Sequence, residues 1–594
     1  MVQSVRSADA DLVTYELLIG GKAAPDATIV KHIDVDLALN RLPRARVAID
    51  DGSPAAEDFP QSASSVFVPG QEIEIKLGYH SKNASVFKGV ILGQTIRMDA
   101  EGGTELVLNC GDKAAKLALA RVSAQFHDAK DSDVMAKIIT DAGLTSDVAA
   151  TSAKVAQQVQ SASSAWDFIL SRAEANGMVV NVAGGKVSIA KPSMDSPTLR
   201  AEFGDTIATL NLELDATQQL SAVTADAWAP KDQKKLEAAA SEPSVNKQGN
   251  LSGKTLSDVL GVSLALQTDA ALDQDALRQW ADAQMLKSRL ARIRGEVGFQ
   301  GNAGVKPGTL LDLAGLGARF NGAGYVSGVR HTLEAGDWET EATLGLHRDW
   351  FADSHRDVTA ASAAALKPGV EGLQIAKVLK THEDPGKEFR IQVNMPLQKD
   401  GAEGVWVRLA APYASEKCGV EFLPEVGDEV VLGFLGGDPD AGVVLGALHS
   451  SARPPPITPV EKNSVKAVVT KSQIKMSFDD DKKSFQVETP GGQVVTLSDE
   501  GKSITLKDST GNSVELSESG IKMSSPKDVS ITATGKVSIK GTGGVTVESP
   551  ADVGIKGLNA TLNGDVAAKV KGGASAELSA GAEAKVQAAM VMIN

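Results

Sequence analysis

The sequence of 594 residues contains few cysteines and no long apolar run. Its two cysteines, Cys110 and Cys418, lie far apart in the chain, so they cannot supply a disulfide framework or a zinc site. No segment approaches the roughly eighteen consecutive apolar residues of a membrane span. The first residues lack a basic segment followed by an apolar one, which predicts a protein made in the cytoplasm without a secretory signal.

Aromatic residues and net positive charge are also scarce. Aromatic side chains make up 4% of the chain, and because ligand pockets are usually lined with them, this shortage favours a structural protein over an enzyme. The 75 Asp and Glu residues exceed the 60 Lys and Arg residues and give a formal net charge of −15. This balance disfavours nucleic acid as a partner, since phosphate binding needs clustered Lys and Arg.

The C-terminal region carries a regular repeat of residue pairs. The two members of a pair are separated by one residue, and successive pairs recur with a fixed octad period that slips by one residue after the fifth pair. The pairs are Ile521/Met523, Val529/Ile531, Val537/Ile539, Val545/Val547, Val553/Ile555, Ala560/Leu562, Ala568/Val570, Ala576/Leu578, Ala584/Val586 and Met592/Asn594. Two residues at this spacing lie on one face of a strand, and the mostly polar residues between pairs fit turns and an outer face. The fixed period therefore predicts stacked, similar units.

One chain cannot bury these pairs by itself. Strands of about five residues bury one narrow face and leave open edges. If three chains wind about a common axis, the pairs fill a shared interior, at roughly 1.5–3 kcal/mol for each buried Val or Ile. We therefore predict a trimeric intertwined β-helix, or needle, over residues 463–594. The alternatives are a single-chain β-solenoid, which normally needs longer coils, and a disordered tail, which the regular β-branched pairs disfavour.

The rest of the chain predicts a mainly β protein with some α-helix. Residues 450–462 are a Pro-rich linker, and residues 371–449 contain five short strands between turn signals, which favours a small antiparallel barrel. Residues 355–370 are an Ala-rich connector. Residues 1–354 are predicted to mix strands and helices, with an exposed inserted loop near 229–265.

Within residues 1–354, the predicted helices are 131–142, 163–176 and 273–290. The predicted strands are 11–19, 33–39, 45–49, 71–77, 86–97, 104–109, 179–190, 207–214, 293–299, 309–313, 324–334 and 338–346.

Residues 419–448, GVEFLPEVGDEVVLGFLGGDPDAGVVLGAL, resemble the OB-fold signature of VgrG-type spike proteins and their relatives in contractile-tailed phages. The signature residues are Pro424, Gly427, Gly437, Asp438 and Pro439. Pro424 and Gly427 are predicted to shape the turn into one strand, and Asp438 begins the turn into the next. Residues 395–430 resemble the spikes of extracellular contractile injection particles more than type VI VgrG proteins.

Fragments of the N-terminal half resemble the phage hub, or late-control D-type, domain. They are residues 67–79, 85–91, 161–180 and 306–344. The resemblance implies two hub β-barrels per subunit, an OB-fold collar, and a homotrimer that docks a hexameric tail-tube protein and baseplate proteins. It also implies a small tip protein of the PAAR type and a place in a phage tail-like particle, delivered outside or into a target cell on contraction.

Candidate catalytic and metal-ligating residues form no constellation in the sequence. Residues 457–594 contain no His, Cys, Trp or Tyr, and the acidic run 479–481 with lysines beside it is typical of a solvated turn. His382, Glu383 and Asp384 precede a Pro–Gly pair, which indicates an exposed loop tip. We therefore predict no catalytic, cofactor-binding or metal site, and no cofactor.

These observations lead to a mechanical hypothesis. The chain is expected to be a membrane-puncturing spike at the tip of a contractile injection apparatus, in transient contact with a target membrane and with effector cargo as a further expectation. Met590, Met592 and Asn594 end the repeat and are predicted to contact the tip cap. The alternative is a trimeric β-helical tailspike with polysaccharide-degrading or receptor-binding activity, which would need a groove with paired acids.

Overall fold

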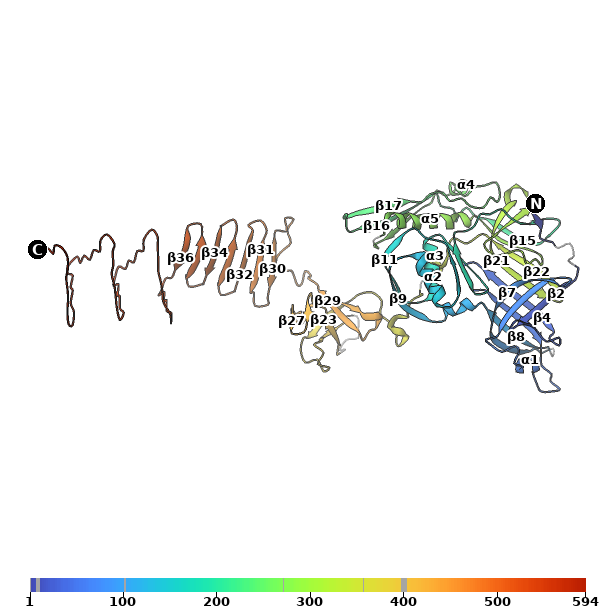
Figure 1. Ribbon diagram of the computed structural model, residues 1–594, viewed down its shortest axis with the longest axis horizontal. Coiled ribbons are helices and arrows are strands. Elements are labelled where there is room, and N and C mark those ends of the chain that lie inside the picture. Colours follow the sequence, from blue (N-terminus) through green and yellow to red (C-terminus); the bar gives the residue numbers. More distant parts are fainter. Residues whose placement is uncertain are drawn as a thin grey trace. The chain divides into compact units, whose positions relative to one another are not determined.

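The computed structural model describes residues 2–6, 11–100, 103–270, 272–355, 357–396 and 403–593. The chain divides into two compact units, Met1–Leu448 and His449–Asn594. Strands predominate in the first unit, and among the described residues its helices are the only ones in the chain (Figure 1). The predicted mainly β fold class with some α-helix is confirmed.

One branched sheet of fourteen strands forms most of the first unit (Figure 1). Its strands are β1 (Gln3–Ser4), β2 (Val13–Ile19), β3 (Lys22–Ala23), β4 (Val30–Ala38), β5 (Arg44–Asp50), β6 (Glu72–Tyr79), β7 (Lys82–Met98), β8 (Thr104–Gly111), β14 (Leu199–Glu202), β15 (Ile207–Leu214), β19 (Ile293–Gln300), β20 (Leu310–Ala314), β21 (Gly322–Glu334) and β22 (Asp337–Leu344). The main path runs β1-β14-β20-β21-β4-β5-β8-β7-β6-β2-β3. The branch β22-β19-β15 leaves this path at β21.

Alternation along the strands decides which face of this sheet is buried. Ile33 and Val35 of β4 are fully buried, whereas Asp34 between them lies on the polar face. One apolar core packs beneath β2 and β4 to β8, with Ile33 and Val35 among its members. A second core lies beneath β19 to β22 and includes Val297 and Val329.

The two hub barrels implied by the resemblance do not form as separate closed barrels, because their main strands belong to one branched sheet. The 13 residues of β21 pair with β20 at the start of the strand, and with both β22 and β4 along the rest of it. Because this strand is long enough to serve both halves, two separate cores share one continuous hydrogen-bonded sheet. Among the described strands, only the five-stranded barrel later in the chain closes.

A smaller α+β layer follows β8 in the chain. It contains η1 (Lys113–Ala118), α2 (Asp131–Asp141), α3 (Ala165–Ala175), β10 (Thr145–Val148), β12 (Val179–Ala183) and β13 (Lys186–Ala190), together with a two-stranded antiparallel sheet of β9 (Arg121–Lys130) and β11 (Lys154–Ser164). Both predicted helices form. The hydroxyl of Ser164 caps α3 by accepting a hydrogen bond from the Asp167 N–H at 3.0 Å.

The prediction of an exposed inserted loop near 229–265 is wrong. This segment contains β17 (Lys234–Ala239), α4 (Gly253–Ser257) and the start of β18 (Ser263–Thr268), and the two strands pair with opposite edges of β16 (Ala222–Ala229). The predicted third helix, α5 (Gln274–Leu290), packs on this sheet and buries its alanines. The sequence did not reveal β17, because its buried face is supplied partly by alanine, which is only weakly hydrophobic. The neighbouring lysines hide the alternation of apolar and polar residues along the strand.

The remaining helices are short. They are α1 (Pro60–Ala63), α6 (Gly317–Phe320) and α7 (Phe351–Ser354). No helix among the described residues is both long enough and apolar enough to cross a lipid bilayer.

Lys287 of α5 is completely buried and fully paired. Its Nζ lies 2.5 Å from Glu174 Oε1 on α3 and 2.7 Å from Asp353 Oδ2 on α7. The same Nζ lies 5.7 Å from the ring centre of Trp350. The other oxygen of Glu174 accepts a hydrogen bond from the Ala352 N–H at 2.8 Å. This network ties α3 and α5 to the segment that enters the connector.

A five-stranded barrel ends the first unit. Its strands are β23 (Gln374–Lys380), β24 (Ile391–Asn394), β25 (Val405–Leu409), β28 (Glu429–Phe434) and β29 (Gly442–Ala447), closed in the order β23-β24-β25-β29-β28. Alternate residues fill its core, among them Val378, Val393 and Val444. The five predicted strands all form. A small hairpin of β26 (Ala414–Ser415) and β27 (Cys418–Gly419) lies between β25 and β28.

The connector contains a left-handed turn, η2 (Ser362–Ala365). Three consecutive alanines, Ala363, Ala364 and Ala365, have φ values of 52°, 52° and 59°. A left-handed helical backbone costs an L-residue about 1–2 kcal/mol relative to the right-handed form. The turn is hydrogen-bonded, since the Ala364 N–H donates to the Ala361 carbonyl at 3.0 Å and the Leu366 N–H donates to the Ala363 carbonyl at 2.9 Å.

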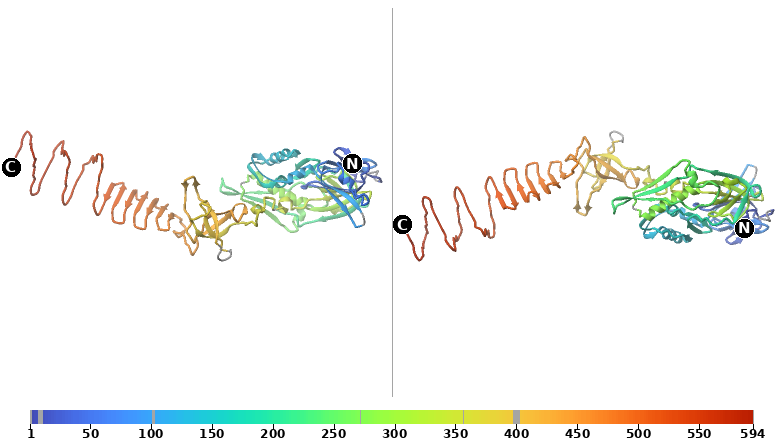
Figure 2. Two further views of the ribbon diagram at one scale, coloured as in Figure 1. Left: turned by 90° about the horizontal axis from the view of Figure 1, so that it is seen from below. Right: turned by 90° about the horizontal axis from the view of Figure 1, so that it is seen from above.

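The second unit begins with a seven-stranded antiparallel meander. Its strands are β30 (Val465–Val469), β31 (Lys475–Asp479), β32 (Ser484–Glu488), β33 (Val494–Ser498), β34 (Ser503–Lys507), β35 (Ser513–Ser517) and β36 (Gly520–Ser524), each paired with the next. The described residues beyond β36, 525–593, contain no strand, and Figure 2 shows them as open excursions of the chain. The octad strands predicted after Met523 therefore do not form in one chain.

We expect Lys287→Met to destabilise the protein strongly. The substitution leaves Glu174 charged and nearly buried without its cation, which typically costs about 3–5 kcal/mol. Lys137→Met is the matched control, because Lys137 forms an exposed pair with Asp141 within α2 and should cost less than about 0.5 kcal/mol. Chemical denaturation of both variants measures the difference, and equal losses would contradict the structural role of Lys287.

His331 of β21 is buried beside Trp338. Its Nδ1 lies 2.9 Å from Thr340 Oγ1, and the ring centres of His331 and Trp338 are 5.9 Å apart. Burial lowers the pKa of His331 from 6.5 to about 4, so the imidazole is neutral at pH 7.

This burial predicts a pH dependence of stability. The unfolded chain binds a proton at His331 below pH 6.5, whereas the folded chain does so only near pH 4, so the free energy of unfolding falls between these values. The loss from this residue is about 3 kcal/mol at most. Compared with the wild type, His331→Gln should lose less stability between pH 7 and pH 4.5. His347→Gln, at an exposed position, should behave like the wild type, and the same behaviour in His331→Gln would refute the assignment.

Candidate functional site

The predicted signature residues lie in the two turns that flank β28. Pro424 and Gly427 precede the strand, where Gly427 has a φ of 90° and its N–H donates to the Val378 carbonyl at 2.8 Å. Gly437 ends η3 (Leu435–Gly437) after the strand with a φ of 71°. These two glycines occupy left-handed backbone that other residues adopt only with strain.

The second turn, which contains Asp438 and Pro439, also holds the connector. The Gly437 carbonyl accepts a hydrogen bond from the Val370 N–H at 2.8 Å. Lys367 lies 3.5 Å from Asp438 Oδ1 and also pairs with Asp440. The sequence indicates a turn here but does not reveal this contact, because the connector lies some seventy residues earlier.

The loop at His382, Glu383 and Asp384 is organised by its aspartate. Asp384 accepts hydrogen bonds from the Gly386 N–H at 3.0 Å and from Arg390 Nη2 at 2.7 Å. The Arg390 guanidinium, together with these backbone N–H groups, holds the pKa of Asp384 well below its usual range. Among the described residues, no group of three His, Cys, Asp or Glu side chains is placed to hold a metal ion.

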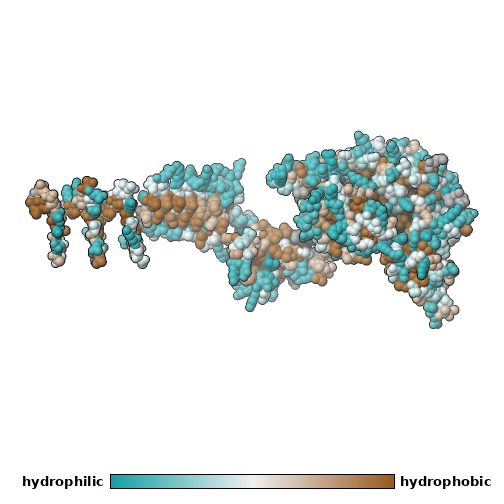
Figure 3. All heavy atoms as spheres, in the orientation of Figure 1, coloured by the Kyte–Doolittle hydropathy of each residue, from teal (hydrophilic) through white to brown (hydrophobic). Residues whose placement is uncertain are grey.

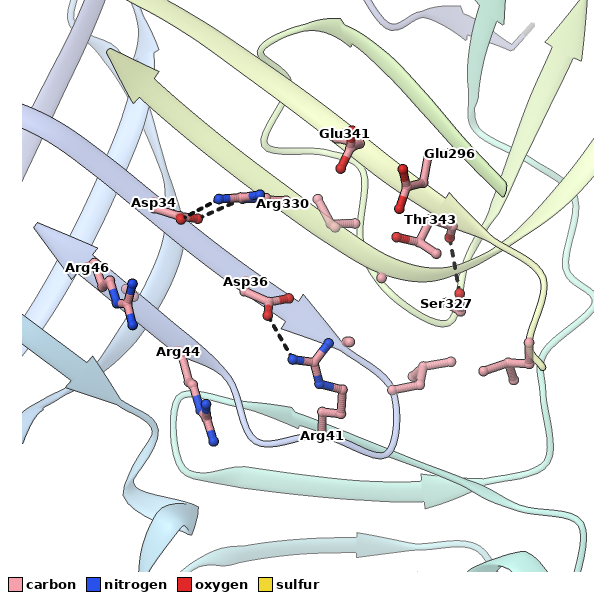
Figure 4. Close-up of a pocket in the computed structure, with 16 residues that line it drawn as sticks. Asp34, Asp36, Arg41, Arg44, Arg46, Glu296, Ser327, Arg330, Glu341 and Thr343 are labelled. Carbon is pink, nitrogen blue, oxygen red and sulfur yellow. Dashed lines mark hydrogen bonds and ion pairs between the residues drawn. The ribbon is translucent and has the colours of Figure 1, made fainter. Parts of the chain in front are cut away.

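A groove of about 580 Å³ crosses the polar face of the large sheet, along β4, β5, β21 and β22 (Figure 4). Arg330 donates to both oxygens of Asp34, at 3.0 and 2.7 Å, and Arg41 pairs with Asp36 at 3.1 Å. Both aspartates of β4 therefore have a guanidinium partner.

The groove also holds a carboxyl group without such a partner. Burial and the nearby Glu296 raise the pKa of Glu341 above its ordinary value, although Arg330 opposes the shift. The nearby Ser327 hydroxyl donates to the Thr343 carbonyl, so it is not placed against a base.

Two unbroken apolar rows cross one face of the meander in the second unit (Figure 3). Cross-strand pairing aligns Val468, Met476, Val487, Val495, Leu506, Val514 and Met523 in one row, and Phe478, Phe485, Leu497, Ile504, Leu516 and Ile521 in the other. The opposite face presents Ser477, Gln486, Thr496, Thr505, Glu515 and Lys522. The exposed fractions of Val495 and Leu506, 36% and 45%, show that no described segment of the second unit covers the rows.

The pairs beyond the meander are more exposed still. Val529 is 59% exposed and Ile555 is 85% exposed. Of the predicted tip residues, Met590 and Met592 are exposed at 76% and 81%, and Asn594 lies outside the described residues. The candidate functional surface is therefore the apolar face of β30 to β36, and exposed apolar residues follow it in the chain up to Ile593.

Two protein families match the chain. Residues 9–335 match the family described as Alg8 N-terminal domain, and residues 374–449 match the family described as type VI secretion system/phage-baseplate injector OB domain. The first match covers more than half of the chain. The second spans the five-stranded barrel and both signature turns.

Similar curated proteins include VgrG proteins. The type VI secretion system spike protein VgrG2a of Pseudomonas aeruginosa is 30% identical over 140 residues, which are 21% of this chain and 16% of that protein. VgrG4b of the same species is 35% identical over 97 residues, 15% of this chain and 12% of that protein. The actin cross-linking toxin VgrG1 of Vibrio cholerae is 30% identical over 99 residues, 16% of this chain and 9% of that protein. The chain thus matches only a small part of each relative, and the predicted resemblance to VgrG-type spike proteins is confirmed.

Similar solved structures include a tail protein from Neisseria meningitidis and an Escherichia coli component of the type VI secretion system. The first has a TM-score of 0.42 and 15% identity, and covers 58% of this chain and 99% of its own. The second has a TM-score of 0.37 and 14% identity, and covers 73% of this chain and 100% of its own.

We expect Gly427→Ala to destabilise the barrel by about 1–2 kcal/mol, because a Cβ strains the backbone at a φ of 90°. Gly446→Ala in β29 is the matched control, since its backbone is not left-handed and no atom lies within 4 Å of the added methyl group. Thermal unfolding of both variants measures the effect. A neutral Gly427→Ala would show that the turn does not require glycine.

Proposed function

The chain belongs over residues 9–335 to the family of the Alg8 N-terminal domain, and from this premise, with the injector OB domain that follows, we propose that it is a structural, non-enzymatic spike that punctures membranes for a contractile injection apparatus. The observation that carries the proposal is the pair of uncovered apolar rows on β30 to β36. A face of this kind on a soluble protein marks an interaction surface.

The proposed occupant of this surface is the same surface on two further copies of the chain. A single-layer sheet with one apolar face needs a second layer to be stable. In a homotrimer each meander would face two others, and the rows would form a closed apolar interior with the polar face outward. The pairs from Val529 onward have the same two-residue spacing, so they would continue this interior as an intertwined β-helix.

We assign one proposed role to each successive segment of the chain. Residues 1–354 would form the hub that docks a hexameric tail-tube protein and baseplate proteins, 355–370 the connector, 371–449 the OB-fold collar, 450–462 the linker and 463–594 the needle. Met590, Met592 and Asn594 would meet a PAAR-type tip protein, which could bring effector cargo. The protein would be made in the cytoplasm and leave it as part of a phage tail-like particle.

Leu506→Asp tests the trimer, because it places a charge within the proposed interior, where an unpaired carboxylate is costly. The wild type should have a solution mass of three times 61.7 kDa, and Leu506→Asp should shift the mass toward one chain. Thr505→Asp, on the opposite face of the same strand, should remain trimeric. A soluble wild-type monomer or dimer with ordered β30 to β36 would overturn the proposal.

The tailspike alternative is tested separately, by incubating the purified protein with cell-wall and capsule polymers. Our proposal expects no turnover. Turnover that disappears when one specific acidic residue is replaced would establish an enzyme instead.

A further inference from the structure

The connector folds back onto the turn between β28 and β29. Besides the Val370–Gly437 hydrogen bond and the ion pairs of Lys367, the two segments approach very closely at Ser362. A Cβ built on Gly437 would lie 2.0 Å from Ser362 Oγ, and a Cβ on Gly369 would meet the same atom at 2.0 Å. Two glycines thus make room for one serine, and we call residues 361–370 the connector latch.

The latch contains the left-handed turn of Ala363, Ala364 and Ala365. Glycine adopts this backbone without cost, yet three alanines occupy it. Ala364 and Ala365 are exposed, so their methyl groups are not kept there by packing, whereas Ala363 is buried. Strained backbone of this kind persists only where its surroundings impose it. Here the surroundings are the contacts with the turn at Gly437–Asp440, which we call the signature turn.

We propose that residues 361–370 form a strained latch, which the turn at Gly437–Asp440 holds closed and which opens as one unit while the barrel stays folded. Opening releases the left-handed backbone and breaks only the contacts described above. The four residues of η2 then pass from a rise of about 2 Å to about 3.3 Å each, so the connector lengthens by roughly 5 Å. In a spike that is driven forward, the longer connector would allow the parts on either side of it to move apart. The latch lies within one chain, so it does not depend on the proposed trimer.

Hydrogen exchange of the full-length protein tests the proposal. The reporters are the amides of Ala364 and Leu366, which donate to carbonyls within the latch, and of Val370, which donates to the Gly437 carbonyl of the turn that holds the latch closed. The reference is the Val378 amide, which donates to the Asp428 carbonyl inside the barrel at 2.9 Å. The three reporters should exchange through one common opening, at least about tenfold faster than Val378.

Amino-acid substitutions distinguish the strain of the left-handed backbone from the contacts that hold the latch closed. Ala364→Gly should slow exchange of the reporters about two- to fivefold, because glycine removes strain from the closed latch. Ala136→Gly, in the right-handed helix α2, should leave the reporters unchanged and lower the melting temperature. Lys367→Met should speed exchange of the reporters about two- to fivefold through loss of its ion pairs.

Two neighbouring glycines provide a second matched pair. Gly437→Ala should speed exchange of the reporters more than about tenfold, because its Cβ collides with Ser362. Gly436→Ala has a similar φ of 60° but no atom within 4 Å of the added methyl group, so it should have a much smaller effect.

Reporters that exchange only together with Val378 would refute a separate opening. Faster or unchanged exchange of the reporter amides in Ala364→Gly would refute the proposal that the closed latch is strained. Should Gly437→Ala fail to fold, Ala364→Gly and Lys367→Met still decide the question.

Discussion

The two apolar rows of β30 to β36 are the constraint on which the second unit depends. Consecutive strands pair in order, so most apolar side chains of β31 to β36 come to one face of a sheet a single layer thick, and Val468 of β30 joins them there. No further segment of the described second unit covers this face, and residues 525–593 add more exposed apolar pairs instead. The chain therefore specifies a surface that its own residues do not satisfy, which is why the proposed function is an assembly.

In the first unit, by contrast, the buried cations Lys287 and Arg289 have carboxylate partners within the same unit. Lys287 lies between two carboxylates, and Arg289 donates to both oxygens of Glu242 at 2.6 and 2.9 Å. A buried charge with such partners contributes a defined arrangement of helices more than net stability.

The signature turn shows how one motif can serve two physical purposes. Its glycines permit left-handed backbone between β28 and β29, which is the local role that the sequence pattern indicates. Its carboxylates and the carbonyl of Gly437 also bind the connector. The absence of a side chain at Gly437 serves both purposes, because it permits the turn and admits Ser362.

Much of this architecture was predictable from local pattern. Strands with large alternating apolar residues, such as β4 and β21, were found within a few residues of their ends, as were α2, α3, α5 and the five barrel strands. The two-stranded sheet of β9 and β11 was missed because polar residues dominate it, and β17 was missed because alanine supplies its buried face. The needle was predicted over residues 463–594, but its apolar pairs were traced only from Ile521 onward, although one row begins at Val468 of β30 and the other at Phe478 of β31.

The sequence by itself determined where most strands lie and which face of each is apolar, because both follow from residues a few positions apart. Only the tertiary structure decided that β21 is shared by both halves of the sheet, that Lys287 lies between Glu174 and Asp353, and that Lys367 meets the signature turn. These arrangements join residues from 66 to almost 300 positions apart, and their proximity depends on how whole elements pack rather than on any local preference.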